Sequence, residues 1–192
     1  MRYSTLILKL KYIRYYWTAA NSRGHGIHSP FVFKFIQEKL NAKIVAETIE
    51  NESPSVVKLM QAIDLATKYK LPKKIKRLIF RCVDQFKPAT SCIISNELSQ
   101  AYFTINDKID FAFLAENNSA EFMLKNVDEV LQKMHSNSWM IIQGIHSSRA
   151  MEDAWAKAKN HPKVRLTIDL FFIGLVFVRK AQKEKEHFII SY

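Results

Sequence analysis

The chain has 192 residues and a mass of 22.4 kDa, enough for one domain or for one domain with an N-terminal appendage. Its hydrophobic fraction of 48% and charged fraction of 24% are typical of a globular protein. The longest apolar run, residues 170–178, is far shorter than the roughly 20 residues of a membrane-spanning helix. Basic residues also interrupt any signal-peptide core near the N-terminus. We therefore expect a cytoplasmic protein with no transmembrane segment.

The net charge of +11 is unevenly distributed along the chain. Residues 1–45 contain eight Lys or Arg against one acid, and so do residues 68–87. Such basic zones suit nucleic acid, an anionic membrane or an acidic partner, or they are simply solvated helix faces. The two cysteines, Cys82 and Cys92, have no metal-binding spacing, and we expect both to be buried thiols in a reducing compartment.

The N-terminal part of the chain is predicted to be helical. Residues 4–20 place Leu6, Leu10, Ile13 and Trp17 at helical spacing, which indicates an amphipathic helix with a basic face. We expect this helix to pack on the domain or on a second subunit, with a membrane surface or RNA as alternatives. It is therefore a candidate surface for a homo-oligomer or a protein partner.

A glycine- and histidine-containing segment follows, and Ser29 with the proline after it marks the start of a helix over residues 30–40. His25 and His28 lie in the loop before that helix. No carboxylate or thiol accompanies them, so they indicate a tied-down loop more than a metal site, and we predict no metal.

Two further helices are predicted, over residues 54–69 and 72–86. The second has one apolar face and one basic face. The basic face is the most coherent candidate for binding nucleic acid or another anion, and it comprises Lys73, Lys74, Lys76, Arg77 and Arg81.

Strands are predicted at residues 91–95, 110–115 and 139–142, with helices over 119–134 and 147–160. Strands alternating with helices indicate an α/β fold with a parallel sheet. Residues 164–172, 173–179 and 187–192 are strand-like without intervening helices, so we expect antiparallel additions. The expected organisation is an N-terminal helical extension, residues 1–50, and an α/β domain, residues 51–192.

Three phrases resemble class I S-adenosylmethionine-dependent methyltransferases, in particular a bacterial group related to small-molecule O-methyltransferases. The phrases are RGHGIHSPF (residues 23–31), QGIHSS (residues 143–148) with Glu152 and Trp155 downstream, and DLFFIGLVF (residues 169–177). The resemblance implies a Rossmann-like sheet in the order 3-2-1-4-5-7-6, with strand seven antiparallel. It also implies S-adenosylmethionine as cofactor, with Ser95, Glu116, Gln143 and Gly144 at the family's cofactor-binding positions and His146 as the catalytic candidate.

The chain departs from this family pattern at four places. No glycine follows the first strand, and residues 96–109 are too few for a complete strand–helix–strand insert, so strands two and three are expected to be missing. The family's Asp-Gly-Asn-His is Ala115-Glu-Asn-Asn here, and its Asp-Asp pair is Gln143 and Gly144. Neither of these two residues supplies a carboxylate to a metal or acts as a base.

The first hypothesis is therefore a truncated, non-catalytic methyltransferase-like protein, a pseudoenzyme without bound cofactor that acts by binding or assembly. The second is an active methyltransferase with an atypical cofactor site, in which His146 is the general base and Glu116 the nearest polar anchor. The third is a basic module that binds RNA or an anionic membrane through the basic face of residues 72–86. His146 has a structural interpretation as well, as a cap of the following helix.

Overall fold

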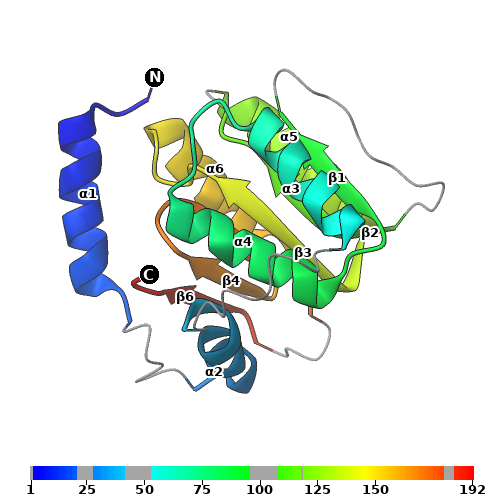
Figure 1. Ribbon diagram of the computed structural model, residues 1–192. Helices are drawn as coiled ribbons and strands as arrows, with labels where there is room; N and C mark the ends of the chain where they lie inside the picture. Colours follow the sequence, from blue (N-terminus) through cyan, green and yellow to red (C-terminus); the bar gives the residue numbers. More distant parts are fainter. Residues whose placement is uncertain (1, 21–27, 42–52, 96–107, 118, 180–183) are drawn as a thin grey trace.

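The computed structural model describes residues 2–20, 28–41, 53–95, 108–117, 119–179 and 184–192, and the structural statements below concern these ranges. They form an α/β structure around a mixed six-stranded sheet, with the order β1-β2-β3-β5-β4-β6 (Figure 1). The strands are β1 (Ser91–Ile94), β2 (Ile109–Leu114), β3 (Met134–Gln143), β4 (Leu166–Asp169), β5 (Ile173–Phe177) and β6 (Glu186–Ile189).

The helices agree with the sequence prediction to within a few residues. They are α1 (Thr5–Thr18), α2 (Pro30–Phe35) with the π-helical turn η1 (Ile36–Leu40), α3 (Pro54–Ala66), α4 (Lys73–Phe86), α5 (Ala120–Lys133) and α6 (Arg149–Asn160). The hydroxyls of Ser119 and Ser148 cap α5 and α6 by accepting a hydrogen bond from a backbone N–H of the first turn. Of the helices in the described ranges, none is long and apolar enough to cross a membrane.

Two hydrophobic cores lie on opposite faces of the sheet. Alternate residues of β2 separate them, since Phe111 and Phe113 join the core beneath α2, η1, α3 and α4, whereas Ala112 and Leu114 join the core beneath α5 and α6. Both faces of the sheet are therefore covered, which explains the continuous apolar sequence of its central strands.

The C-terminal strands correct one prediction. β5 is antiparallel to both β3 and β4, as expected, but β6 pairs with β4 in parallel. The chain passes beyond β4 after β5, so β6 has the opposite direction to β5 but the same direction as β4, the strand it pairs with.

Helix α1 stands apart from both cores, at the left of the sheet in Figure 1, and packs on the domain through one face. Its inward residue is Tyr15, which is buried and donates a hydrogen bond to the carbonyl of Ile190. The apolar stripe of the helix faces outward and is exposed at Leu6, Leu10, Ile13 and Trp17. The packing face is aromatic and polar, and both faces of α1 carry large side chains.

A close contact between β5 and α6 gives a test of the packing. A Cβ added at Gly174 would lie 2.6 Å from the indole ring of Trp155. We expect Gly174→Ala to lower the free energy of unfolding by about 1–3 kcal/mol, because the ring or the strand must shift. In a Trp155→Phe background the smaller ring leaves room, so the additional cost should fall. Urea unfolding of the four proteins of this cycle measures the coupling, and strict additivity would contradict the contact.

Candidate functional site

The residues singled out from the sequence lie at the carboxyl edge of the parallel strands. Ser95 follows β1, Glu116 follows β2, and Gln143 ends β3 just before Gly144. Parallel strands end at the same edge of a sheet, where α/β proteins place ligands. The structure brings Glu116, Gln143 and Gly144 together, whereas Ser95 is buried and does not line the cavity found there.

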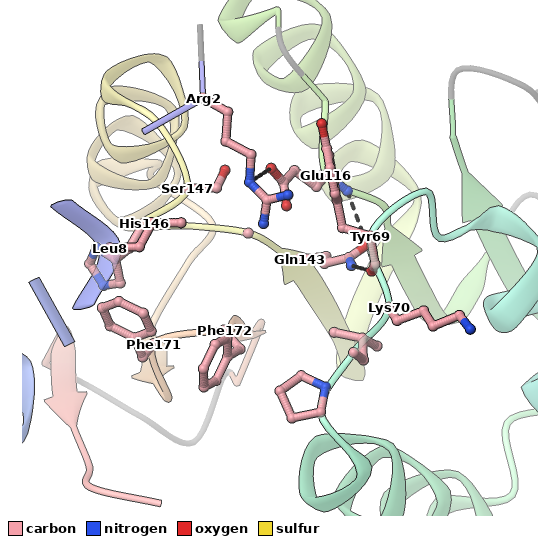
Figure 2. A pocket seen from close by; sticks show the side chains of 13 residues that line it. Arg2, Leu8, Tyr69, Lys70, Glu116, Gln143, His146, Ser147, Phe171 and Phe172 are labelled. Carbon is pink, nitrogen blue, oxygen red and sulfur yellow. Dashed lines mark hydrogen bonds and ion pairs between the residues drawn. The ribbon is translucent and has the colours of Figure 1, made fainter. Parts of the chain in front are cut away.

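Glu116 is the central charge of this site. Its side chain is only 4% exposed, and its Oε1 lies 3.3 Å from Nε of Arg2, which comes from the residues preceding α1 (Figure 2). The Arg2 guanidinium also lies 3.6 Å from the centre of the Tyr69 ring. Burial raises the pKa of Glu116 overall, although the nearby Ser147 hydroxyl and the charge of Arg2 act in the opposite direction. Arg2 of the N-terminal segment therefore places its positive charge beside the buried carboxyl group of Glu116.

Gln143 joins three parts of the chain at this edge. Its Oε1 accepts a hydrogen bond from the backbone N–H of Glu116 at 3.2 Å, and its Nε2 donates to the carbonyl of Tyr69 at 2.7 Å (Figure 2). Both the oxygen and the nitrogen of this side-chain amide thus form hydrogen bonds within the protein. They link β3 to the segment after β2 and to the segment between α3 and α4.

Gly144 has a left-handed backbone conformation, with φ of 73°, that favours glycine. A Cβ at this position would also lie 2.6 Å from Oε2 of Glu116. Space above the turn after β3 is therefore occupied by the Glu116 carboxylate, and any side chain at position 144 would compete with it.

The remaining space at the strand ends is a cavity of about 90 Å³. Ligand pockets for nucleotide-sized or drug-sized molecules are typically about 300–1,000 Å³. Its lining comprises Arg2, Leu8, Tyr69, Lys70, Leu71, Pro72, Glu116, Gln143, Gly144, His146, Ser147, Phe171 and Phe172. Figure 2 shows the Arg2 side chain extending over this space towards Glu116 and Tyr69.

His146 is held between two carboxylates. Its Nε2 lies 2.7 Å from Oδ2 of Asp169, and its Nδ1 lies 3.4 Å from Oε1 of Glu152. Burial alone would lower the pKa of His146, but the hydrogen bonds and charges of the two carboxylates outweigh it and raise that pKa. Because both ring nitrogens face acceptors, the arrangement favours the imidazolium and leaves neither nitrogen free to act as a base. Ser148, and not His146, caps α6.

Glu152 lies in the first turn of α6 and anchors α1. Its carboxylate accepts hydrogen bonds from the Tyr3 hydroxyl at 3.0 Å and from Nζ of Lys11 at 2.9 Å. Burial would raise the pKa of Glu152, and these hydrogen bonds, together with that of His146, lower it overall. The backbone N–H of Tyr3 also donates to the carbonyl of Ser147 at 2.8 Å.

Sequence reasoning missed the N-terminal half of this site. Arg2, Tyr3 and Lys11 come from the opposite end of the chain, and no local pattern relates them to Glu116 or Glu152. Asp169 belongs to the third phrase of the family resemblance, but nothing in the sequence pairs it with His146.

A second cavity of about 220 Å³ lies between α1 and the His146 cluster, which is His146 with Glu152 and Asp169, and Arg14 borders part of it.

The basic face predicted on α4 is present but partly paired. Nζ of Lys76 lies 2.5 Å from Oδ1 of Asp64, and Nζ of Lys74 lies 4.1 Å from the centre of the Tyr192 ring. Arg81 donates to the Tyr192 hydroxyl at 2.9 Å. Lys73 and Arg77 are exposed.

A metal centre finds no support in the described part of the chain, which contains no group of three or more His, Cys, Asp or Glu side chains suited to hold an ion. His28 is exposed, and His25 lies outside the described residues.

Both cysteines are buried and free, and burial raises the pKa of Cys82 to about 12 and that of Cys92 to about 11. Neither thiol is poised as a nucleophile.

Comparison with known proteins gives no assignment, since no protein-family model matches the chain and no curated protein matches it significantly. Function is therefore inferred from the site geometry and the strand order.

The His146 cluster predicts a specific pH dependence of stability. A histidine whose pKa is raised on folding stabilises the protein below about pH 6.5, and this contribution is lost as the pH rises through the folded-state pKa. We expect His146→Gln to lower the free energy of unfolding by about 2 kcal/mol near pH 6 and by clearly less near pH 9. Urea unfolding at both pH values measures the difference. The control His28→Gln, at an exposed position, should change neither value, and an equal cost of His146→Gln at both would contradict the doubly paired imidazolium.

Proposed function

We propose that the protein is a degenerate, non-catalytic relative of class I S-adenosylmethionine-dependent methyltransferases that acts by binding or assembly. The observation that carries the proposal is the occupation of the strand-end site by the chain's own N-terminal segment, whose Arg2 contacts Glu116 and Tyr69 there. A site that binds its own polypeptide is unavailable to a substrate in this conformation.

The strand order supports the proposed ancestry. The sequence β1-β2-β3-β5-β4 corresponds to the 1-4-5-7-6 portion of the family order, and β5 is antiparallel to its neighbours, as strand seven is in the family. On this proposal, family strands two and three are missing and β6 is an addition at the other edge. The residues that would contain the missing strands, 96–107, lie outside the described ranges.

The residues present do not fit the family's cofactor. The cavity of about 90 Å³ is below the size of ordinary ligand pockets, and Glu116 fills the space directly above Gly144. The chain has no glycine between Gly26 and Gly144, so the close backbone approach of a glycine-rich turn is not available after β1. We therefore propose that S-adenosylmethionine is not bound.

The two other hypotheses receive less support. In the hypothesis of a working methyltransferase His146 is the general base, but both of its ring nitrogens face carboxylates. The hypothesis of a nucleic-acid-binding module on α4 is less favoured, because Lys74, Lys76 and Arg81 already contact other side chains of the chain. We also propose a cytoplasmic location.

A thermal-shift titration with S-adenosylmethionine tests the proposal. A ligand present at 100 times its dissociation constant stabilises a protein by about 2.7 kcal/mol, which corresponds to roughly 2–4 °C at this size. We expect no saturable shift for the wild-type chain, with an active class I methyltransferase as the positive control in the same assay. A reproducible, saturable shift would show that the site still accepts the cofactor and would overturn the pseudoenzyme assignment.

A further inference from the structure

Helix α1 is oriented unusually, because its most apolar face points away from the protein. Leu6, Leu10, Ile13 and Trp17 lie along one stripe and are 69%, 60%, 54% and 84% exposed. Soluble proteins seldom expose a contiguous row of large apolar side chains unless the row meets a partner. The α1 stripe is thus an apolar surface that no other described residue of the protein covers.

The orientation is fixed by contacts on the opposite face. Tyr12 and Tyr15 pack against the ring of Phe171, with centroid distances of 5.0 and 5.3 Å. Lys11 pairs with Glu152, and the residue after the helix, Ala20, is hydrogen-bonded through its backbone N–H to the carbonyl of Ile189 at 2.8 Å. With its inner face and both flanking segments bound, α1 cannot turn its stripe inward without losing these contacts.

Basic side chains border the α1 stripe. At about 100° per residue, Lys9 and Arg14 project roughly 70° to either side of the stripe's centre. Both are exposed, and among the described residues neither pairs with a carboxylate. Residues 2–20 contain no Asp or Glu at all. The outward surface is consequently apolar in the middle and positive on both margins.

We propose that α1 docks the protein on an anionic lipid bilayer, with the α1 stripe in the headgroup region and Lys9 and Arg14 at the lipid phosphates. Interfacial helices carry this combination of an apolar face and basic margins. Trp17 suits the boundary between headgroups and acyl chains, and the long Lys and Arg side chains reach outward to the phosphates.

A second copy of the chain fits this surface less well. In a symmetric antiparallel pair of α1 helices, each margin lies beside the same margin of the other copy, so Lys9 would face Lys9 and Arg14 would face Arg14. With no acid in residues 2–20, nothing on either helix offsets this repulsion. An anionic surface is complementary to both margins at once. Docking does not depend on whether the strand-end site binds a cofactor, so it stands or falls separately from the proposed function.

The test is co-sedimentation of the full chain with vesicles of phosphatidylglycerol and with vesicles of phosphatidylcholine. We expect binding to the former that weakens with salt, and little binding to the latter. Tryptophan emission gives a second measurement, because Trp139 and Trp155 are 2% and 3% exposed. A blue shift on adding anionic vesicles therefore reports Trp17. The double variant Lys9→Gln with Arg14→Gln should bind about thirtyfold more weakly.

Leu10→Asp is expected to abolish vesicle binding, whereas the matched control Leu65→Asp, at a leucine of α3 that is 75% exposed, should bind as the wild type does. Circular dichroism checks that both variants fold. Docking is overturned by an absence of binding to anionic vesicles, by equal binding to both lipids, or by wild-type binding of Leu10→Asp. A concentration-dependent dimer that Leu10→Asp dissociates would assign the α1 stripe to a second copy instead.

Discussion

A carboxylate buried at the end of a strand needs a positive partner, and much of the arrangement of this protein follows from that constraint. Glu116 is 4% exposed, and an unpaired charge at that depth would cost several kcal/mol. Arg2 supplies the partner, which requires the N-terminal segment to cross the carboxyl edge of the sheet. Tyr3 and Lys11 then meet Glu152, whose carboxylate also faces His146. The same contacts that fill the candidate site also position α1.

Elements with a local signature were predicted correctly from the sequence. The apolar stripe of α4 and the start of α5 at Ser119 depend on residue types a few positions apart. The parallel pairing of β1, β2 and β3 follows from the alternation of strands and helices along the chain. The inward face of α1 could not be predicted, because tyrosines on one side compete with leucine, isoleucine and tryptophan on the other. Only the tertiary contacts of Tyr15 with Phe171 and Ile190 decide between them.

Only part of the candidate site could be predicted from the sequence. Gln143 ends a strand, and Glu116 and His146 come shortly after strands, so their place at the sheet edge could be inferred. The partner of Glu116, Arg2, comes from the N-terminus, and Asp169, a partner of His146, comes from β4, so neither pairing could be predicted. Gly144 shows how one residue type alters the chemistry of the site. Where the resembled family has a carboxylate, this chain has a left-handed glycine beneath the Glu116 side chain. A site for an external ligand has thus become, on the proposed function, an attachment point for α1, which leaves the outer face of that helix for another partner.

The dependence of Glu116 on Arg2 can be measured most directly by a double-mutant cycle on the free energy of unfolding. Arg2→Ala alone should cost about 3 kcal/mol, because it leaves a buried carboxylate unpaired. In the Glu116→Gln background the same substitution should cost little, since the neutral amide no longer needs the cation and the partly exposed arginine is hydrated on its own. An equal cost of Arg2→Ala in both backgrounds would contradict the central role of this ion pair.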